Sequence, residues 1–251
     1  MNTYFNINYE FDKKAVHEAI EVAQKGYICV ADGVVMNTAN RDTEYLDVVN
    51  GGLFAICDSS WVPVYLKSIY GIKYEQYCGA EIFKDIVSSQ KYRMMFLGTS
   101  QATLEGLRQE LMKMNPDVEL MQFVELPFRN VEDFDYPGIA DMVNADGAKI
   151  IWVALGAPKQ EKFMNKLLPY LTSGVMIGVG AAFKFYSGTE EKRCPTWMQK
   201  AHLEFVYRII QDPKKQLKRC YWIVRTLPGL YFAEVKRKKA AKKLGNMVTD
   251  A

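Results

Sequence analysis

Residues 149–163, which read KIIWVALGAPKQEKF, decide the fold of this chain. The run opens with a nearly all-apolar segment, as expected for a strand buried on both faces of a parallel sheet. Gly156 follows that strand, and Pro158 stands at or near the first position of a helix, which proline favours. A buried strand followed directly by a helix is the repeating unit of α/β proteins.

The same alternation extends through residues 12–180. Apolar runs rich in Val, Ile and Phe predict strands at residues 27–32, 53–58, 92–98, 118–124, 149–155 and 175–180. Segments of helical period lie between them, at about residues 12–25, 39–49, 60–70, 79–89, 101–114, 131–144 and 159–171. This order predicts an α/β fold with a doubly wound, mainly parallel sheet covered by helices.

Charge is distributed unevenly along the chain. The 251 residues carry 32 Lys and Arg against 29 Asp and Glu, a net charge of +3. Residues 214–243 hold eleven Lys or Arg and one acid, Glu234, so they sum to +10, whereas residues 1–213 hold 21 bases and 27 acids and sum to −6. The protein is therefore predicted to have an acidic body and a basic C-terminal segment.

The strand pattern stops at about Pro195. We therefore expect an α/β body over residues 1–195 and a helical appendage over residues 196–251. Its helices are expected at residues 197–211 and 214–243, with interruptions near Pro213 and Pro228-Gly229.

The composition, 49% hydrophobic and 24% charged, is that of a globular protein and excludes a disordered or collagen-like chain. No two of the five cysteines form a C-x-x-C pair, which predicts a reducing compartment. The N-terminal run MNTYFNINYEFDKKAV lacks the features of a signal peptide, and no apolar stretch approaches the roughly 20 residues of a spanning helix. We therefore expect a cytoplasmic protein.

A metal or other cofactor is not expected. His17 and His202 have no Cys or carboxylate partner at ligand spacing, and no D-x-D pair follows a strand. This pattern also gives little support to a Ser-His-Asp triad.

Ligands of doubly wound sheets bind beyond the carboxyl ends of the strands, so the residues after each strand are candidate site residues. They are Asp32, Asp58, Gly98-Thr99, Gly156 and Gly180 with their neighbours. Asp58 follows a buried strand, where it could act as general base for a hydroxyl nucleophile. The alternative is that Asp58 caps the helix that begins near Trp61.

The segment GAPKQE would direct backbone N–H groups and a positive helix end toward the crevice, where a phosphate or sugar hydroxyl could bind. Lys159 could meet a phosphate, and Gln160 could hold a sugar ring through its donor and acceptor atoms. The alternative is an ordinary helix start whose Lys-Gln-Glu face is solvated.

The segment Gly98-Thr99-Ser100 is similar to the entry of a nucleotide-binding loop. The full G-x-G-x-x-G pattern is absent, which weakens a hydride-transfer hypothesis. The alternative is that Thr99 or Ser100 caps the next helix.

The basic segment interleaves its cations with aromatic and leucine side chains. This pattern is typical of a segment that binds an anionic membrane surface. Binding of nucleic acid is not expected, because it would rest on this segment alone and the body is acidic. The alternative interpretation is that this segment is merely a solvated helix.

Three segments together resemble one bacterial family in order and spacing. They are IIWVALGAPKQEKF, IGVGAAFKFYSG and KRCPTWMQKAHLEFVYRIIQDPKKQLKR. The chain resembles the WecG/TagA/CpsF glycosyltransferases over almost its whole length.

The resemblance implies a Rossmann-like body with a membrane-targeting appendage, at the inner face of the cell membrane. It implies inverting, metal-free transfer of an N-acetylated aminosugar, or its uronic acid, from a UDP-sugar to a polyprenyl-diphosphate-linked sugar. Such reactions build teichoic acid linkage units, enterobacterial common antigen and capsules. A catalytically inactive nucleotide-sugar-binding scaffold or regulator is the alternative, and the oligomeric state, including a homo-oligomer, stays open.

Carried over by position, Asp58 falls on the proposed catalytic base of the family and Gln160 on its active-site glutamine. Lys215 and Arg219 fall on appendage positions thought to reach the diphosphate. This chain departs from the family pattern at Val30-Ala31-Asp32, Ser59, Gln76 and Lys184. These departures surround the expected sugar and diphosphate site, so the identities of donor and acceptor stay open.

Overall fold

The computed structural model describes residues 2–188, 210 and 213–249. Its strands are β1 (Asn2–Tyr4), β2 (Ile7–Tyr9), β3 (Lys25–Ala31), β4 (Phe54–Cys57), β5 (Met94–Gly98), β6 (Gln122–Val124), β7 (Ile150–Ala154) and β8 (Gly174–Gly178). Its helices are α1 (Lys13–Val22), α2 (Gly33–Ala39), α3 (Thr43–Asn50), α4 (Trp61–Tyr70), α5 (Gly79–Ser89), α6 (Gln101–Met112), α7 (Tyr136–Asp146), α8 (Lys159–Leu167), α9 (Ala182–Ser187) and α12 (Pro213–Thr249).

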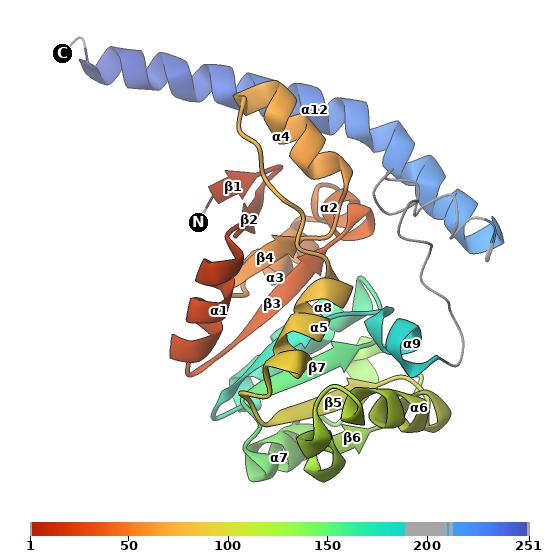
Figure 1. The fold of residues 1–251 in the computed structure, drawn as a ribbon. Coiled ribbons are helices and arrows are strands. Elements are labelled where there is room, and N and C mark those ends of the chain that lie inside the picture. Colours follow the sequence, from red (N-terminus) through yellow and green to blue (C-terminus); the bar gives the residue numbers. More distant parts are fainter. Residues whose placement is uncertain (1, 189–209, 211–212, 250–251) are drawn as a thin grey trace.

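Within the described residues, eight strands form one sheet in the order β1-β2-β4-β3-β8-β7-β5-β6 (Figure 1). The pair β1–β2 is antiparallel, and every other neighbouring pair is parallel. The predicted α/β fold with a doubly wound, mainly parallel sheet is therefore confirmed.

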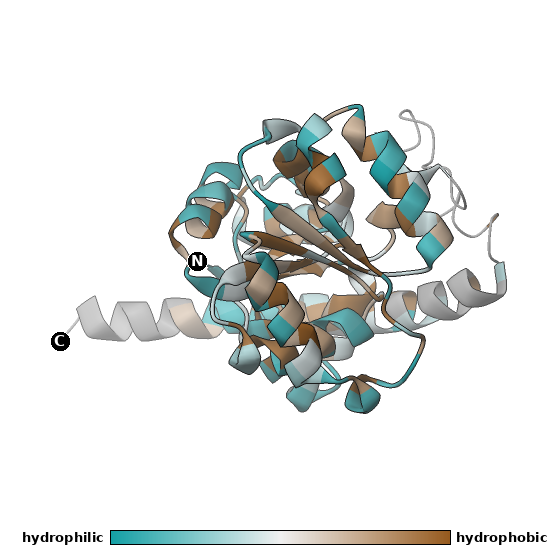
Figure 2. Ribbon diagram, turned by 90° about the horizontal axis from the view of Figure 1, so that it is seen from below, coloured by the Kyte–Doolittle hydropathy of each residue, from teal (hydrophilic) through white to brown (hydrophobic). Residues whose placement is uncertain are grey.

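Alternate side chains of the central strands enter two separate apolar cores. In β3, Tyr27 and Cys29 belong to one core, while Ile28 and Val30 belong to the other. The first core is covered by α2, α3, α4, α7 and α8, and the second by α1, α5, α6 and α9. Figure 2 shows the apolar strands between these two layers of helices. Because both faces are covered, the central strands carry continuous apolar runs.

Several elements differ from the prediction, among them α9, which was not predicted. The β1–β2 hairpin and α2 were not predicted, and the helix expected over residues 39–49 corresponds to α3. The strand expected over residues 118–124 is only β6, because a 3-10 helix occupies Pro116–Leu120. Asn115 caps that turn by accepting from the Asp117 N–H at 3.1 Å, and proline favours its first turn.

Helix α12 continues through Pro228, so the predicted interruption there is wrong. A proline removes one hydrogen bond of the helix, but Pro228 lies on the exposed side, where water can satisfy the freed carbonyl. On the other side, Leu227 is buried and packs into the first core. The helix expected over residues 197–211 lies outside the described residues except for residue 210.

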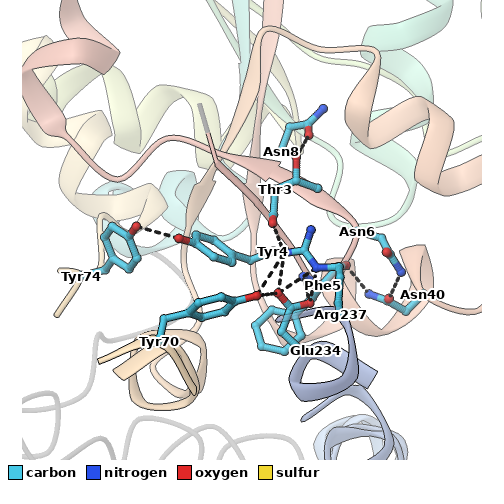
Figure 3. A network of polar contacts seen from close by, with 10 residues as sticks. All are labelled: Thr3, Tyr4, Phe5, Asn6, Asn8, Asn40, Tyr70, Tyr74, Glu234 and Arg237. Carbon is cyan, nitrogen blue, oxygen red and sulfur yellow. Dashed lines mark hydrogen bonds and ion pairs between the residues drawn. The ribbon is translucent and has the colours of Figure 1, made fainter. Parts of the chain in front are cut away.

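Helix α12 packs along α2 and α4 and reaches the β1–β2 hairpin (Figure 1). Asn37 donates to the Trp222 carbonyl at 3.2 Å, and Arg41 lies over the Trp222 ring. Figure 3 shows Glu234 and Arg237 of α12 directed toward Tyr70 and the hairpin. The basic segment is therefore joined to the body by buried polar contacts.

Candidate active site

A cavity of about 560 Å³ opens at the carboxyl ends of the parallel strands. Seven residues that the sequence predicted as site residues line it: Asp32, Asp58, Thr99, Gly156, Lys159, Gln160 and Gly180. Residues at or just after the carboxyl ends of β3, β4, β5, β7 and β8 meet here because parallel strands end at the same edge of a sheet.

The other predicted site residues take different places. Gly98 and Pro158 adjoin residues of the cavity wall, and Gln76 lies two positions before the wall residue Cys78; none of the three lines the cavity. Lys215 and Arg219 lie in α12, but their side chains are outside the described part of the structure.

Asp58 lines the cavity directly after β4, and its backbone N–H donates to the Ala31 carbonyl at 3.1 Å. The capping residue of α4 is Ser60, which makes no side-chain capping bond. Asp58 therefore lies two positions before the N-cap of this helix. As a residue of the cavity wall, Asp58 lies where a general base would be needed.

Asp32 has a second task besides lining the cavity. Its Oδ1 accepts from the N–H groups of Val34 and Val35 at 2.8 and 2.9 Å, so it caps α2. An acceptor at this position satisfies N–H groups that have no partner within the helix. Asp32 is thereby fixed in the wall.

The turn after β5 brings the backbone close to β7. Gly98 has φ +121°, and a Cβ there would lie 2.6 Å from the Ala154 carbonyl oxygen. Only glycine fits this approach. Thr99 follows with φ +56°, and Ser100 caps α6, as the alternative for this segment predicted.

The Gln160 side chain hydrogen-bonds the backbone at the ends of β7 and β8. Its Nε2 donates to the Gly178 carbonyl at 3.0 Å, and its Oε1 accepts from the Gly156 N–H at 3.2 Å. Pro158 occupies the capping position of α8, one residue before the helix begins. Gln160 and Glu161 are 3% and 0% exposed, so the alternative of a solvated Lys-Gln-Glu face is wrong.

Glu161 is a buried carboxyl that sequence reasoning did not single out. Its Oε1 accepts from Gln160 Nε2 at 2.9 Å, and its Oε2 accepts from Tyr45 Oη at 3.0 Å. Burial raises the pKa of Glu161 to about 7, although these hydrogen bonds act in the opposite direction. In the sequence, a glutamate in a first helical turn resembles any solvated residue. The one signal of a functional role was the position of Glu161 within P-K-Q-E.

The loop after β6 supplies a second missed feature. Glu125, Leu126, Pro127 and Phe128 line the cavity, and the Phe128 side chain is fully exposed. Lys159 Nζ lies 5.0 Å from the Phe128 ring centre and 5.2 Å from that of Phe134. These cation–π contacts hold a lysine at the cavity rim. The loop has no regular pattern from which this position could be predicted.

The charges of the cavity wall have both signs. Asp32, Asp58 and Glu125 are its acids, and Lys159 and Lys184 are its bases among the described residues. In that part of the chain, no group of three or more His, Cys, Asp or Glu side chains is placed to hold a metal ion. Lys159 and Lys184 are thus the described cations that a bound anion would meet.

Comparison with known proteins gives consistent matches. A family model described as the glycosyl transferase WecG/TagA/CpsF family matches residues 4–243. A Bacillus subtilis protein named N-acetylglucosaminyldiphosphoundecaprenol N-acetyl-beta-D-mannosaminyltransferase is 27% identical over 205 residues, which cover 77% of this chain and 78% of that protein. Proteins of the same name from Bacillus spizizenii and Staphylococcus aureus are 23% and 22% identical over 86% of this chain, and the matches cover 81% and 82% of those proteins.

Proposed function

This chain belongs to the WecG/TagA/CpsF family and is a glycosyltransferase, and from that premise we propose that it moves a sugar from a UDP-sugar to a polyprenyl-diphosphate-linked sugar. The donor sugar is an N-acetylhexosamine or its uronic acid. The names of the relatives specify transfer of N-acetylmannosamine to a diphosphoundecaprenol-linked N-acetylglucosamine. The reaction contributes to bacterial surface polysaccharide biosynthesis.

The position of Asp58 carries this proposal. Asp58 lines a cavity large enough for a nucleotide sugar, at the edge where doubly wound sheets bind such ligands, and this supports its assignment as the base. Asp58 removes the proton of the acceptor hydroxyl while that oxygen bonds to the anomeric carbon. The bond from that carbon to the UDP oxygen breaks on the opposite side, so the configuration inverts.

Cations of the protein offset the charge that develops on the departing diphosphate. Lys159 and Lys184 line the cavity, and we assign Lys215 and Arg219 to the same task. Fixed cations stabilise developing negative charge strongly in a water-poor site. In this mechanism no metal ion is required.

The outer face of α12 supports attachment to a membrane surface. Leu217, Tyr221, Val224 and Phe232 are 56%, 57%, 68% and 63% exposed, and their spacing places them on one side of the helix. Trp222 and Leu227, on the opposite side, contact the body. An exposed apolar stripe on a cationic helix is typical of binding to an anionic lipid surface.

This attachment would place the enzyme on the inner face of the cell membrane, where the lipid-linked acceptor lies. Among the helices of the described residues, none is both long and apolar enough to cross a bilayer. The proposed division of labour assigns the cavity with Asp58 to residues 1–195. Residues 196–251 then bind the membrane and contribute Lys215 and Arg219 to the diphosphate site.

The proposal is tested with the full-length protein, a panel of UDP-sugars and a polyprenyl-diphosphate-linked N-acetylglucosamine acceptor. We expect UDP release only when donor and acceptor are both present, together with a new disaccharide-lipid product. UDP binding without release for any donor would instead support a non-catalytic scaffold.

A further inference from the structure

The orientation of the Gln160 side-chain amide is fixed by backbone groups. The Gly178 carbonyl, 3.0 Å from Nε2, can only accept a hydrogen bond, and the Gly156 N–H, 3.2 Å from Oε1, can only donate one. With the amide reversed, Oε1 would face the Gly178 carbonyl oxygen and Nε2 would face the Gly156 N–H, and neither pair could form a hydrogen bond. Nε2 therefore faces Gly178, and Oε1 faces Gly156.

Both N–H groups of this amide are used inside the protein. One reaches Gly178, and the other reaches Glu161 Oε1 at 2.9 Å. Gln160 thus has no donor left for a ligand, so a role that uses both its donor and acceptor atoms is excluded by this geometry.

The amide oxygen keeps one free acceptor position. Oε1 lies between two cavity-lining glycines, since Gly156 donates to it and a Cβ on Gly180 would stand 3.5 Å away. Among the described residues, Gly156 supplies the one hydrogen bond that this oxygen accepts. A carbonyl oxygen has two lone pairs. The cavity floor therefore offers an acceptor here.

Glu161 is the side chain that completes this arrangement. It is fully buried and joins Gln160 to Tyr45 of α3, which is also fully buried. Burial and the neighbouring Glu161 raise the pKa of the Tyr45 hydroxyl far above its ordinary value, so Tyr45 stays a donor. Without an acceptor at position 161, one Gln160 N–H would be buried without a partner, which is costly.

We propose that Glu161 is a positioning residue that holds Gln160 with only its amide oxygen available to the substrate. The substrate group at this point must then be a donor, either a sugar hydroxyl or the N–H of an N-acetyl group. This inference rests on the proposed function for the identity of the ligand. The arrangement of the three side chains does not depend on it.

Two substitutions at one position separate positioning from simple packing. Glu161→Gln keeps an oxygen that accepts from Gln160 and gains an N–H that can face the Tyr45 oxygen. Glu161→Met has a similar length but no comparable acceptor. For Glu161→Gln we expect kcat/KM for the UDP-sugar to stay within about threefold of wild type. For Glu161→Met we expect it to fall about tenfold or more, because one hydrogen bond is lost.

Solvent exchange of the Gln160 side-chain N–H groups tests the positioning role without measuring activity. The side-chain NH₂ signals of Gln160, assigned by their loss in Gln160→Met, should exchange slowly with solvent in wild type and in Glu161→Gln. They should exchange faster, or broaden, in Glu161→Met. Unchanged protection in Glu161→Met would overturn the positioning role.

Donor analogues test the acceptor role. UDP-sugars that lack one hydroxyl, or that carry an O-acetyl in place of the N-acetyl group, are compared as substrates. One analogue should lose about tenfold in kcat/KM with wild type, and this penalty should shrink in Glu161→Met. If no analogue shows such a penalty, the acceptor assignment is wrong. If wild type transfers no sugar, the proposed function fails, while the amide exchange still decides the role of Glu161.

Discussion

Glu234 accepts a hydrogen bond from the backbone N–H of Phe5 at 3.0 Å, across 229 residues of sequence. Its other oxygen accepts from Tyr70 Oη at 2.7 Å, and Arg237 pairs with the same carboxyl. Glu234 is the one acid of residues 214–243 and is only 3% exposed. The basic segment is thus joined to the body through its single negative side chain.

Glu234→Ala should lower the free energy of unfolding by about 2 kcal/mol, because a buried N–H and a tyrosine hydroxyl lose their acceptor. Urea unfolding measures this change. Lys236→Ala, at an exposed position of the same helix, is the matched control and should leave stability unchanged. Equal stabilities for the two variants would show that the contact is not needed for docking.

Asp58→Asn should lower kcat for sugar transfer by about 10²- to 10⁴-fold, because an amide cannot take the proton of the acceptor hydroxyl. UDP affinity, measured by calorimetry, should stay near that of wild type because the side-chain shape is kept. A variant that retains more than about a tenth of wild-type kcat would contradict the role of a general base.

Glu161 should make stability depend on pH. Its pKa is about 7 in the folded protein and close to its ordinary value of 4.5 when unfolded. The folded state therefore binds the proton more tightly, so the contribution of Glu161 to stability is largest below about pH 4.5 and is lost as the pH rises to about 7. The loss is on the order of 3 kcal/mol.

Denaturant unfolding between pH 5 and pH 8 tests this prediction. Glu161→Gln should remove most of the fall in stability over that range. Glu119→Gln, at an exposed position, should leave it unchanged. An identical pH dependence in wild type and Glu161→Gln would show that Glu161 does not titrate in this range.

The outer stripe of α12 should contribute to membrane binding. The double variant Val224→Asp with Phe232→Asp should reduce co-sedimentation with anionic vesicles severalfold, since it removes apolar contact and adds negative charge. Leu120→Asp, at an apolar residue of the body that is 75% exposed, is the control. Binding that ignores lipid charge, salt and the double substitution would contradict a surface-bound appendage.

Chelation should leave transfer unchanged, because the proposed mechanism offsets the diphosphate charge with lysine and arginine side chains. The measurement is UDP release with and without EDTA. Strong inhibition that added Mn²⁺ reverses would refute metal-independent transfer.

Local sequence patterns were enough to predict the central strands and the position of the site. The runs at β3, β4, β5, β7 and β8 are apolar enough to be recognised locally, because a strand covered on both faces needs no polar residues. Asp58, Gln160, Gly156 and Gly180 could be placed at the cavity because the ends of parallel strands fall at one edge. The order of the motifs also identified the family.

Which groups these residues contact depends on how distant segments of the chain pack together. The strands β1 and β2 have three residues each, too few for a periodic signal, and they are stabilised by pairing and by α12. Glu161 and Glu234 resemble solvated glutamates in sequence, yet both are buried. Pro228 predicts a break that does not occur because contacts with the body hold the helix on the opposite side. Burial and hydrogen-bond partners depend on segments distant in sequence, and local patterns carry little information about them.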